Sequence, residues 1–275
     1  VIFAGLVGIF LYYFFASLLR SIGNSVVPLL FLAVSAVLNI VLDLWFVAGL
    51  NRGVAGAAEA TVISQYVSGI GIAVYTWVKC PELIRKDRAV CLRWSRVREI
   101  TSYSALTCLQ QSIMNLGILA VQGLVNSFGT TVMAAFAAAV KIDAFAYLPV
   151  QDFGNAFSIF TAQNFGAGKT DRIRKGIRAA SFTSMLFGLL ISIAVFVFAE
   201  PLMTLFIDAG ETAVIAEGVR YLRIEGAFYY LIAALFLLYG LYRALGKPGM
   251  SVVLTIVSLG IRVALAYALA PIPLF

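Results

Sequence analysis

The chain has 275 residues, of which 62% are hydrophobic and only 12% are charged, and its mean hydropathy is +0.98. A soluble domain of this length carries about twice that share of charged residues, so the composition excludes an ordinary soluble protein. Histidine is absent, and the three cysteines are Cys80, Cys91 and Cys108. With so few thiol and imidazole ligands, we expect neither a disulfide framework nor a zinc site.

Long apolar segments separated by short charged ones divide the chain into eight candidate membrane spans. A helix needs roughly 20 apolar residues to cross about 30 Å of hydrocarbon. The segments are continuously apolar rather than alternating, and unpaired backbone groups are costly in lipid, so the fold is predicted to be all-α and not a barrel. The spans lie near residues 1–19, 26–48, 54–78, 101–127, 131–162, 177–199, 218–242 and 250–270.

Basic residues between the spans predict which side of the membrane each loop faces. If the eight spans alternate in direction, fifteen of the twenty Lys and Arg residues fall on one side, and the other side collects the acidic residues around Asp208. Because basic loops stay in the cytoplasm, the segment 79–99 and the loops after the first, fifth and seventh spans are predicted to be cytoplasmic. A cytoplasmic membrane surface then accounts for the net charge of +7 without nucleic acid.

An internal repeat predicts how the spans are organised. The stretch LLRSIGNSVVPLLFLAVSAVL from Leu18 is similar to LYRALGKPGMSVVLTIVSLGI from Leu241, at an offset of 223 residues. Each copy reads as a helix, a tight turn and a second helix. The copies are spans one and two and spans seven and eight, so the period is six helices and the halves are parallel repeats.

The only long charged connection, between the third and fourth spans, reads as a linker between two lobes. We therefore expect residues 1–78 to form three helices of an N-terminal lobe, residues 79–99 a cytoplasmic linker, and residues 100–275 five of the six helices of a C-terminal lobe. On this count the chain is a fragment of a twelve-helix protein, without three helices before Val1 and one after Phe275.

Several stretches of the chain, taken together and in order, resemble one family of transporters. They are RSIGNSVVP followed by LNIVLD, GVAGAAEATVISQ from Gly53, QQSIMNLGILAVQGLVNSFG from Gln110, AQNFGAGKTDRIRKG from Ala162 and YRALGKPGMS from Tyr242. The family is that of multidrug and toxic compound extrusion (MATE) transporters. The resemblance implies two six-helix bundles facing each other in a V, alternating access, and export of organic, cationic compounds by antiport with Na+ or H+. No cofactor is implied besides that coupling ion.

Asn39 and Asp43 stand out as polar residues inside the apolar second span. They are four residues apart and therefore lie on one face of a helix. A carboxylate near the bilayer centre costs roughly 2.5–3.5 kcal/mol on insertion scales, so this face should look into a bundle or a wet cavity. By resemblance, Asn39, Asp43 and Thr61 on the next helix match the family's N-terminal cation site, where Na+ is the only metal expected. The alternative is a carboxylate hydrogen-bonded between helices.

The fourth span carries a polar stripe at intervals of four, seven and four residues, which is one face of a helix. Its members are candidates for lining a translocation cavity, and the alternative is amide hydrogen bonding between packed helices. Gln110 and Gln111 occupy the region where one branch of the family has a coupling carboxylate. This difference weakens the argument for an ion site in the second lobe. The stripe consists of Gln111, Asn115, Gln122 and Asn126.

The remaining ionisable residues of the spans are interpreted as mainly structural. Lys141 and Asp143 are two residues apart, so they should face different ways and have separate partners. In the repeat, Arg262 takes the position of Asn39, and Ala266 takes that of Asp43. The two lobes therefore differ at the candidate ion site, which favours ion binding in the first lobe only.

Other function classes fit the residues less well. The segment GKT from Gly168 ends like a phosphate-binding loop, but Gln163 stands where that loop needs glycine, so no nucleotide is expected. A lipid-linked saccharide flippase, the alternative transporter, favours a more basic cavity than Lys141 and Arg262 provide. An enzyme within the membrane needs clustered carboxylates, a histidine or a metal motif, so the chain is not expected to be an enzyme. We expect a monomeric, multi-pass protein of the cell membrane that handles small organic substrates.

Overall fold

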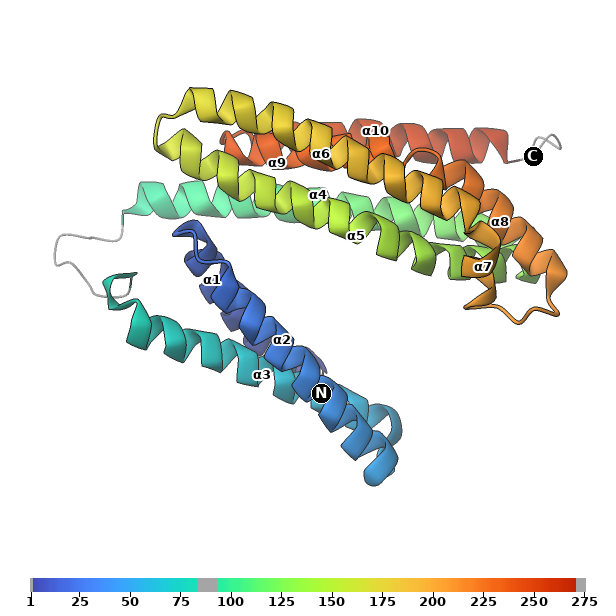
Figure 1. Ribbon diagram of the computed structural model, residues 1–275, viewed down its shortest axis with the longest axis horizontal. Coiled ribbons are helices and arrows are strands. Elements are labelled where there is room, and N and C mark those ends of the chain that lie inside the picture. Colours follow the sequence, from blue (N-terminus) through green and yellow to red (C-terminus); the bar gives the residue numbers. More distant parts are fainter. Residues whose placement is uncertain (1, 84–92, 271–275) are drawn as a thin grey trace. The chain divides into compact units, whose positions relative to one another are not determined.

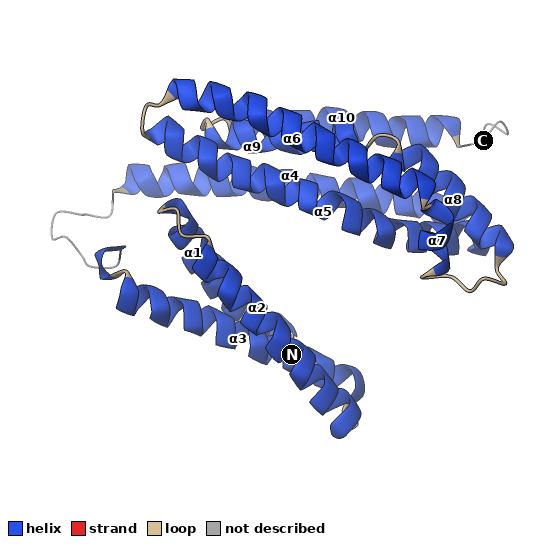
Figure 2. Ribbon diagram, in the orientation of Figure 1, coloured by secondary structure: helices blue, strands red, loops and turns tan. Residues whose placement is uncertain are grey.

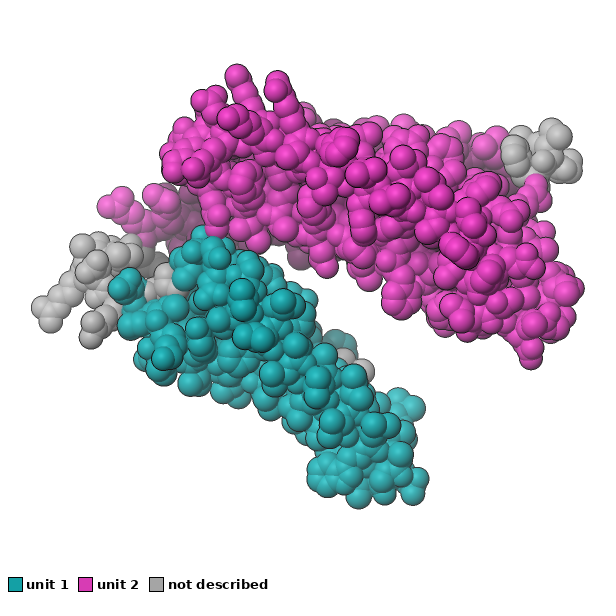
Figure 3. All heavy atoms as spheres, viewed as in Figure 1, with its two compact units in different colours: residues 1–92 teal, residues 93–275 magenta. Residues whose placement is uncertain are grey.

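The computed structural model describes residues 2–83 and 93–270, and helices are the only regular secondary structure in those ranges (Figure 2). The chain divides into two compact units, residues 1–92 and 93–275 (Figure 3). Each unit has a buried core of its own. The boundary falls inside the range 79–99 that the sequence assigns to a linker, and residues 84–92 of that range, with Cys91, lie outside the described residues.

Unit 1 consists of three long helices and three short helical turns. Its elements are η1 (Ile2–Gly5), α1 (Leu6–Ser21), α2 (Val26–Asp43), the π-helical turn η2 (Leu44–Gly49), α3 (Gly53–Lys79) and η3 (Pro81–Leu83). Helix α3 packs against both α1 and α2. Small residues let membrane helices approach closely, and a Cβ on Gly69 would meet the backbone carbonyl of Gly8. The Tyr12 hydroxyl links α1 to α2 by donating to the carbonyl of Pro28 at 2.9 Å.

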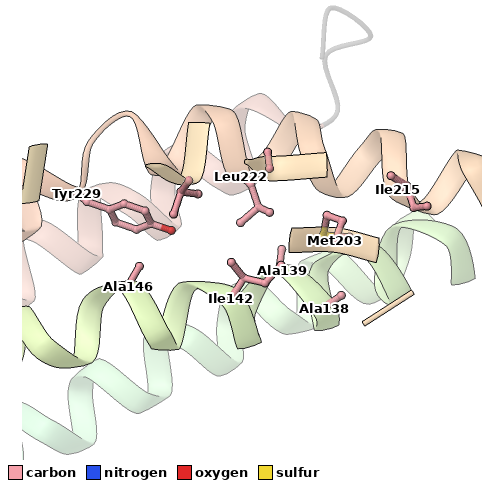
Figure 4. Packing of buried hydrophobic residues seen from close by; sticks show 10 residues of the cluster. Ala138, Ala139, Ile142, Ala146, Met203, Ile215, Leu222 and Tyr229 are labelled. Atoms are coloured by element: carbon pink, nitrogen blue, oxygen red, sulfur yellow. The ribbon is translucent and has the colours of Figure 1, made fainter. Parts of the chain in front are cut away.

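Unit 2 is a helical bundle whose longest members are α4, α5 and α6 (Figure 1). Its elements are α4 (Trp94–Val125), η4 (Asn126–Phe128), α5 (Thr130–Gly166), α6 (Thr170–Val197), α7 (Ala199–Thr204), α8 (Thr212–Gly226), α9 (Tyr229–Ala244) and α10 (Pro248–Leu269). Helix α5 packs against α6, α8 and α9, and α4 packs against α10. The largest core cluster lies between α5, α7, α8 and the start of α9 (Figure 4), and it includes Ala139, Ile142, Met203, Leu222 and Tyr229.

Within the described residues, seven helices are long and apolar enough to cross a membrane, and the bent pair α8–α9 raises the number to eight if it counts as one span. The seventh predicted span, 218–242, corresponds to this pair, which begins at Thr212 and bends by 51° between α8 and α9. Apolar residues continue through the bend, and the helix breaks after Gly226, where the missing side chain lowers helix stability. Hydropathy alone does not reveal such a break.

Two further boundaries differ from the prediction. Helix α4 begins at Trp94, so residues 94–99 belong to a helix and not to the linker. The charged residues Arg96 and Arg98 hide this extension, because a charged turn beyond the bilayer is compatible with a helix but does not score as a membrane span. The sixth span ends at Val197, and the short helix α7 follows it.

Three helices end in the same type of glycine turn. Gly23, Gly168 and Gly246 follow α1, α5 and α9, and each has a positive φ, of 88°, 68° and 74°. In every case the glycine amide bonds to a carbonyl three residues earlier, and the next amide bonds to a carbonyl five residues before it, at 2.9–3.2 Å. This is the Schellman motif, in which glycine tolerates the left-handed conformation. The two copies of the sequence repeat, at Gly23 and Gly246, thus share their turn geometry.

The contact between α5 and α9 depends on two glycines. A Cβ on Gly154 of α5 would lie 2.8 Å from the carbonyl oxygen of Phe236 in α9, and one on Gly240 of α9 would meet the carbonyl of Gly154. Backbone atoms of the two helices therefore approach each other directly, as in other membrane helix pairs with small residues at the interface. This contact fixes the spacing of side chains on either side of it, including Asn155 and Tyr239.

Candidate functional site

The structure brings Asn39 and Thr61 together in unit 1. Asn39 lies on α2 and Thr61 on α3, and Asn39 Nδ2 donates to Thr61 Oγ1 at 3.4 Å. The Thr61 hydroxyl in turn donates to the carbonyl of Ala57 at 2.9 Å. The Asn39 side chain thus uses its nitrogen for this contact. The Asn39 side-chain oxygen and a lone pair on Thr61 Oγ1 are the atoms of this pair that can serve as neutral oxygen ligands of a cation.

Asp43 lies one helical turn further along α2, at its last residue. Its Oδ1 atom is buried and has no hydrogen-bond partner among the described residues. Burying a polar atom is costly unless it is paired, and the cost is larger for a charged carboxylate. A bound cation or a proton would relieve this cost, so the carboxylate suits either one chemically.

A π-helical turn, η2, begins directly after Asp43. At its end, the amide of the C-cap residue Leu50 bonds to the carbonyl of Trp45, five residues back, at 2.9 Å. Such turns are rare and occur frequently at functional sites. The sequence reasoning missed this turn, since the letters LWFVAG are as apolar as those before them and nothing in their spacing distinguishes a π turn from an α turn.

Glu59, the other carboxylate of this unit's long helices, has a different environment. It forms an ion pair with Arg52 near the start of α3. Their side chains are 35% and 52% exposed, so both charges remain in contact with the surroundings of the protein. Glu59 is therefore a neutralised, accessible carboxylate, whereas Asp43 has a buried oxygen without a partner.

The four polar residues of the α4 stripe have different surroundings within unit 2. Gln122 Nε2 donates to Asn126 Oδ1 at 3.0 Å, and Asn115 is exposed. Of the four residues, Gln111 alone lines the pocket recorded in unit 2. Its neighbour Gln110 lines the same pocket and is buried, with 6% of its surface exposed.

This pocket has a volume of about 300 Å³ and lies between α4, α5 and α9. Arg243 crosses it: its Nη2 donates to Asn155 Oδ1 at 3.0 Å, and its Nε donates to the carbonyl of Tyr239 at 3.2 Å. The sequence reasoning missed this site, although Gln151 and Asn155 are four residues apart and so share a helix face. The lining residues are Thr107, Gln110, Gln111, Met114, Gln151, Asn155, Phe236, Tyr239 and Arg243.

An ionic cluster lies where α8 and α9 meet. The Tyr229 hydroxyl donates to the Asp143 carboxylate, and Arg262 Nη2 pairs with Glu225 Oε1 at 3.4 Å. The other oxygen, Glu225 Oε2, is buried and has no partner among the described residues. The cluster has members on four helices, α5, α8, α9 and α10. Because it is assembled from different helices, the spacing of residues along any one helix cannot predict it. It places the Asp143 carboxylate inside the second unit and pairs Glu225 with Arg262, whose side chain is 48% exposed.

The environment of these groups defines the class of protein. Large apolar side chains cover the outer surface of the helices, and α2 buries only Pro28. An apolar surface of this extent belongs in lipid. Ionisable residues inside membrane helices are costly and mark ion or substrate pathways. These features define a multi-pass α-helical membrane protein with ionisable groups inside its helices.

The MatE family model matches residues 107–268. The chain belongs to this family of MATE transporters, and the resemblance inferred from the sequence is confirmed. The probable multidrug resistance protein YpnP of Bacillus subtilis (strain 168) is 30% identical over 256 residues, which cover 93% of this chain and 57% of YpnP. The probable multidrug resistance protein NorM of Thermotoga maritima is 25% identical over 263 residues, which cover 94% of this chain and 56% of NorM.

A solved structure shares the fold. The Vibrio cholerae MATE transporter VcmN in its bent form matches with a TM-score of 0.83 and 26% sequence identity, over 93% of this chain and 57% of VcmN. The all-α membrane fold is therefore confirmed. The chain spans little more than half the length of these relatives, between 56% and 57%.

Proposed function

We propose that the protein is a secondary active multidrug exporter, which moves organic, cationic compounds out of the cell by antiport with Na+ or H+. The observation that carries this proposal is the buried, unpartnered carboxylate oxygen of Asp43 on a membrane helix. The relatives YpnP and NorM support it, because both are named as probable multidrug resistance proteins. The same relatives give no support to a saccharide flippase.

The coupling ion would bind at Asn39, Asp43 and Thr61. Na+ is a hard cation that prefers oxygen ligands, and these residues offer a carboxylate, an amide oxygen and a hydroxyl oxygen. H+ needs the carboxylate alone. An ion can shift a conformational equilibrium only by its differential affinity for the two states. We therefore assign Asp43 the role of the group whose charge is balanced by the ion in one state of an alternating-access cycle and left unbalanced in the other.

The proposal includes a location and an orientation. The protein would lie in the cell membrane, with the segment 79–99 and the glycine turns after α1, α5 and α9 in the cytoplasm. The basic residues in these segments support this orientation, since short basic loops are retained on the cytoplasmic side. Organic substrates and the lipid bilayer would be its partners.

The test is the substitution Asp43→Asn in the protein expressed from its complete reading frame. Neutralising a carboxylate within the membrane removes an insertion cost of roughly 2.5–3.5 kcal/mol, so the variant should reach the membrane at a normal level. An amide offers no charge for an ion to balance, so export driven by a Na+ or H+ gradient should be abolished. Efflux of a fluorescent cationic dye from energised vesicles measures this directly.

Two further variants make the test specific. Glu59→Gln removes a carboxylate of the same unit that is partly exposed and paired with Arg52, so efflux by this variant should stay close to that of the wild type. Thr61→Ala removes one neutral oxygen and should reduce efflux less than Asp43→Asn does. Normal gradient-driven efflux by a well-expressed Asp43→Asn variant would assign Asp43 to packing and overturn the proposal.

A further inference from the structure

We propose that the pocket between α4, α5 and α9 binds the oxyanion of an organic molecule, a carboxylate or a phosphate, with Arg243 as its charged partner. All of its lining residues belong to unit 2. The proposal concerns binding alone and does not depend on ion coupling at Asp43. It adds an anion-recognising site to a protein whose export cargo is proposed above to be cationic.

The first step is the charge of the pocket. Arg243 is half-buried and takes part in no ion pair within the described residues, where the recorded pairs join Arg52 to Glu59 and Arg262 to Glu225. No Asp or Glu residue lines the pocket. A guanidinium stays protonated in proteins, so the pocket carries one uncompensated positive charge. A partly buried charge without a counter-charge is costly, and an anionic ligand would remove that cost.

The second step is the supply of hydrogen-bond donors. Arg243 uses Nε and Nη2 for the bonds to Tyr239 and Asn155, and no bond from its Nη1 is recorded in the described part of the chain. Guanidinium groups bind carboxylates and phosphates through such paired N–H donors. The free Nη1 group is thus available to a ligand in the pocket.

The side-chain amide of Gln110 points to a ligand independently. Gln110 lines the pocket, has only 6% of its surface exposed, and makes no side-chain hydrogen bond to any described residue. Its amide atoms keep access to the pocket, since neither is among the fully buried polar atoms that lack a partner in the described residues. A ligand oxygen in the pocket would accept from this amide, and the amides of Gln111 and Gln151 line the same space.

The third step is the shape of the ligand. One side of the pocket is apolar, formed by Met114 and by the rings of Phe236 and Tyr239, which meet edge to face with centroids 5.9 Å apart. A volume of about 300 Å³ lies at the small end of the range for small-molecule sites. These features fit a compact molecule that joins an oxyanion to a flat apolar body.

A purely structural role explains only part of this arrangement. Arg243 lies in the last turn of α9, where a basic side chain stabilises the helix end, and its bond to the Tyr239 carbonyl serves that purpose. That role requires neither a cavity beside the guanidinium nor the side chains of three glutamines, Gln110, Gln111 and Gln151, along its wall. The pocket and Gln110 therefore indicate that Arg243 belongs to a binding site and does more than cap the helix.

The experiment compares two fluorescent probes that differ only in charge, dansylglycine and dansylglycine amide. The protein from its complete reading frame is placed in phosphatidylcholine nanodiscs, and probe binding is followed by dansyl fluorescence. The acid should bind at least about tenfold more tightly than the amide, since a charge-assisted hydrogen bond contributes about 1.5–3 kcal/mol. Arg243→Gln should abolish this preference, and Arg243→Lys should retain part of it.

Arg172→Gln is the matched control, because Arg172 is an exposed arginine of the same unit that does not line the pocket. Its preference for the acid should equal that of the wild type. Equal affinities of the wild type for acid and amide, or an undiminished preference in folded Arg243→Gln, would overturn the proposal. Arg243→Lys keeps the charge at the helix end, so it serves as the test if Arg243→Gln does not fold.

Nanodiscs that contain phosphatidylglycerol distinguish the two sources of the oxyanion. If the lipid phosphate occupies the pocket, the apparent affinity for dansylglycine falls in these discs, and Arg243→Gln removes the difference between the two lipid compositions. If the affinity is unchanged, the pocket selects a soluble organic anion. Either result supports an oxyanion site, provided that the preference for the acid depends on Arg243.

Discussion

Replacing Gly154 with alanine should separate α5 from α9. The new Cβ would lie 2.8 Å from the carbonyl oxygen of Phe236 and 3.1 Å from its carbonyl carbon. Both are backbone atoms of α9, so neither can rotate away as a side chain can. A carbon and a carbonyl oxygen in contact are normally about 3.3–3.6 Å apart. The helices would have to shift by roughly 0.5 Å to accept the methyl group.

Two opposing effects set the change in the free energy of unfolding caused by Gly154→Ala. Overpacking of this kind costs about 1–3 kcal/mol. Alanine is also a better helix former than glycine, by about 1 kcal/mol inside a helix. Gly260 isolates this second effect, because it lies inside α10 and a Cβ there would meet no atom within 4 Å. Gly154→Ala should therefore be less stable than Gly260→Ala by about 1–3 kcal/mol, the packing cost alone.

The measurement is the free energy of unfolding in mixed detergent micelles titrated with SDS, with both variants and the wild type purified side by side. Gly260→Ala should match or exceed the wild type, and Gly154→Ala should fall below Gly260→Ala. Equal stability of the two variants would refute the close contact between the α5 and α9 backbones. The double variant with Gly240→Ala should be less stable still, since a Cβ on Gly240 would meet the carbonyl of Gly154.

Other predictions follow from the charges and turns. Single cysteines introduced at positions 208 and 169, in place of Asp208 and Lys169, should differ in labelling by an impermeant reagent added outside intact cells. The cysteine at position 208 should react. If the cysteine at position 169 reacted instead, the proposed orientation would be wrong. Gly246→Ala should lower stability by about 1–2 kcal/mol in the same SDS titration, because an L-residue is strained at φ 74°. Arg262→Met should lower the free energy of unfolding because it leaves Glu225 unpaired, and the added substitution Glu225→Gln should restore it. If the two substitutions lowered the free energy of unfolding additively, the ion pair would be refuted.

The sequence predicted the helical membrane fold because hydropathy is a property of whole segments. Seven spans coincide with single helices, and the basic residues of α4 and of the turn after Gly246 lie at one end of unit 2, where the Tyr103 hydroxyl donates to the Gly246 carbonyl at 3.4 Å. The bend between α8 and α9 escaped prediction, since it depends on how the two half-helices pack and not on their polarity.

The candidate sites were predictable to different degrees. Asn39 and Asp43 are visible because they share one helix face in an apolar span, and Thr61 came from the family resemblance. The structure pairs Asn39 with Thr61, whereas their role in ion binding stays a prediction. The Arg243 pocket and the Asp143–Glu225 cluster were not predictable, because their side chains come from several helices. Lys141 and Asp143 do have separate surroundings: Lys141 Nζ lies 5.9 Å from the centre of the Phe206 ring.

The three glycine turns also bear on how the chain enters the membrane during synthesis. Each turn closes through backbone hydrogen bonds within six residues, so it can form before any distant helix is made. Basic residues stand beside these turns, and such residues resist translocation. The pairs α1–α2, α5–α6 and α9–α10 can therefore insert as helical hairpins, and under the orientation proposed above each turn would remain on the cytoplasmic side. A glycine replacement at Gly23 or Gly168 would then act first on the yield of inserted protein, and only afterwards on the stability of the finished fold.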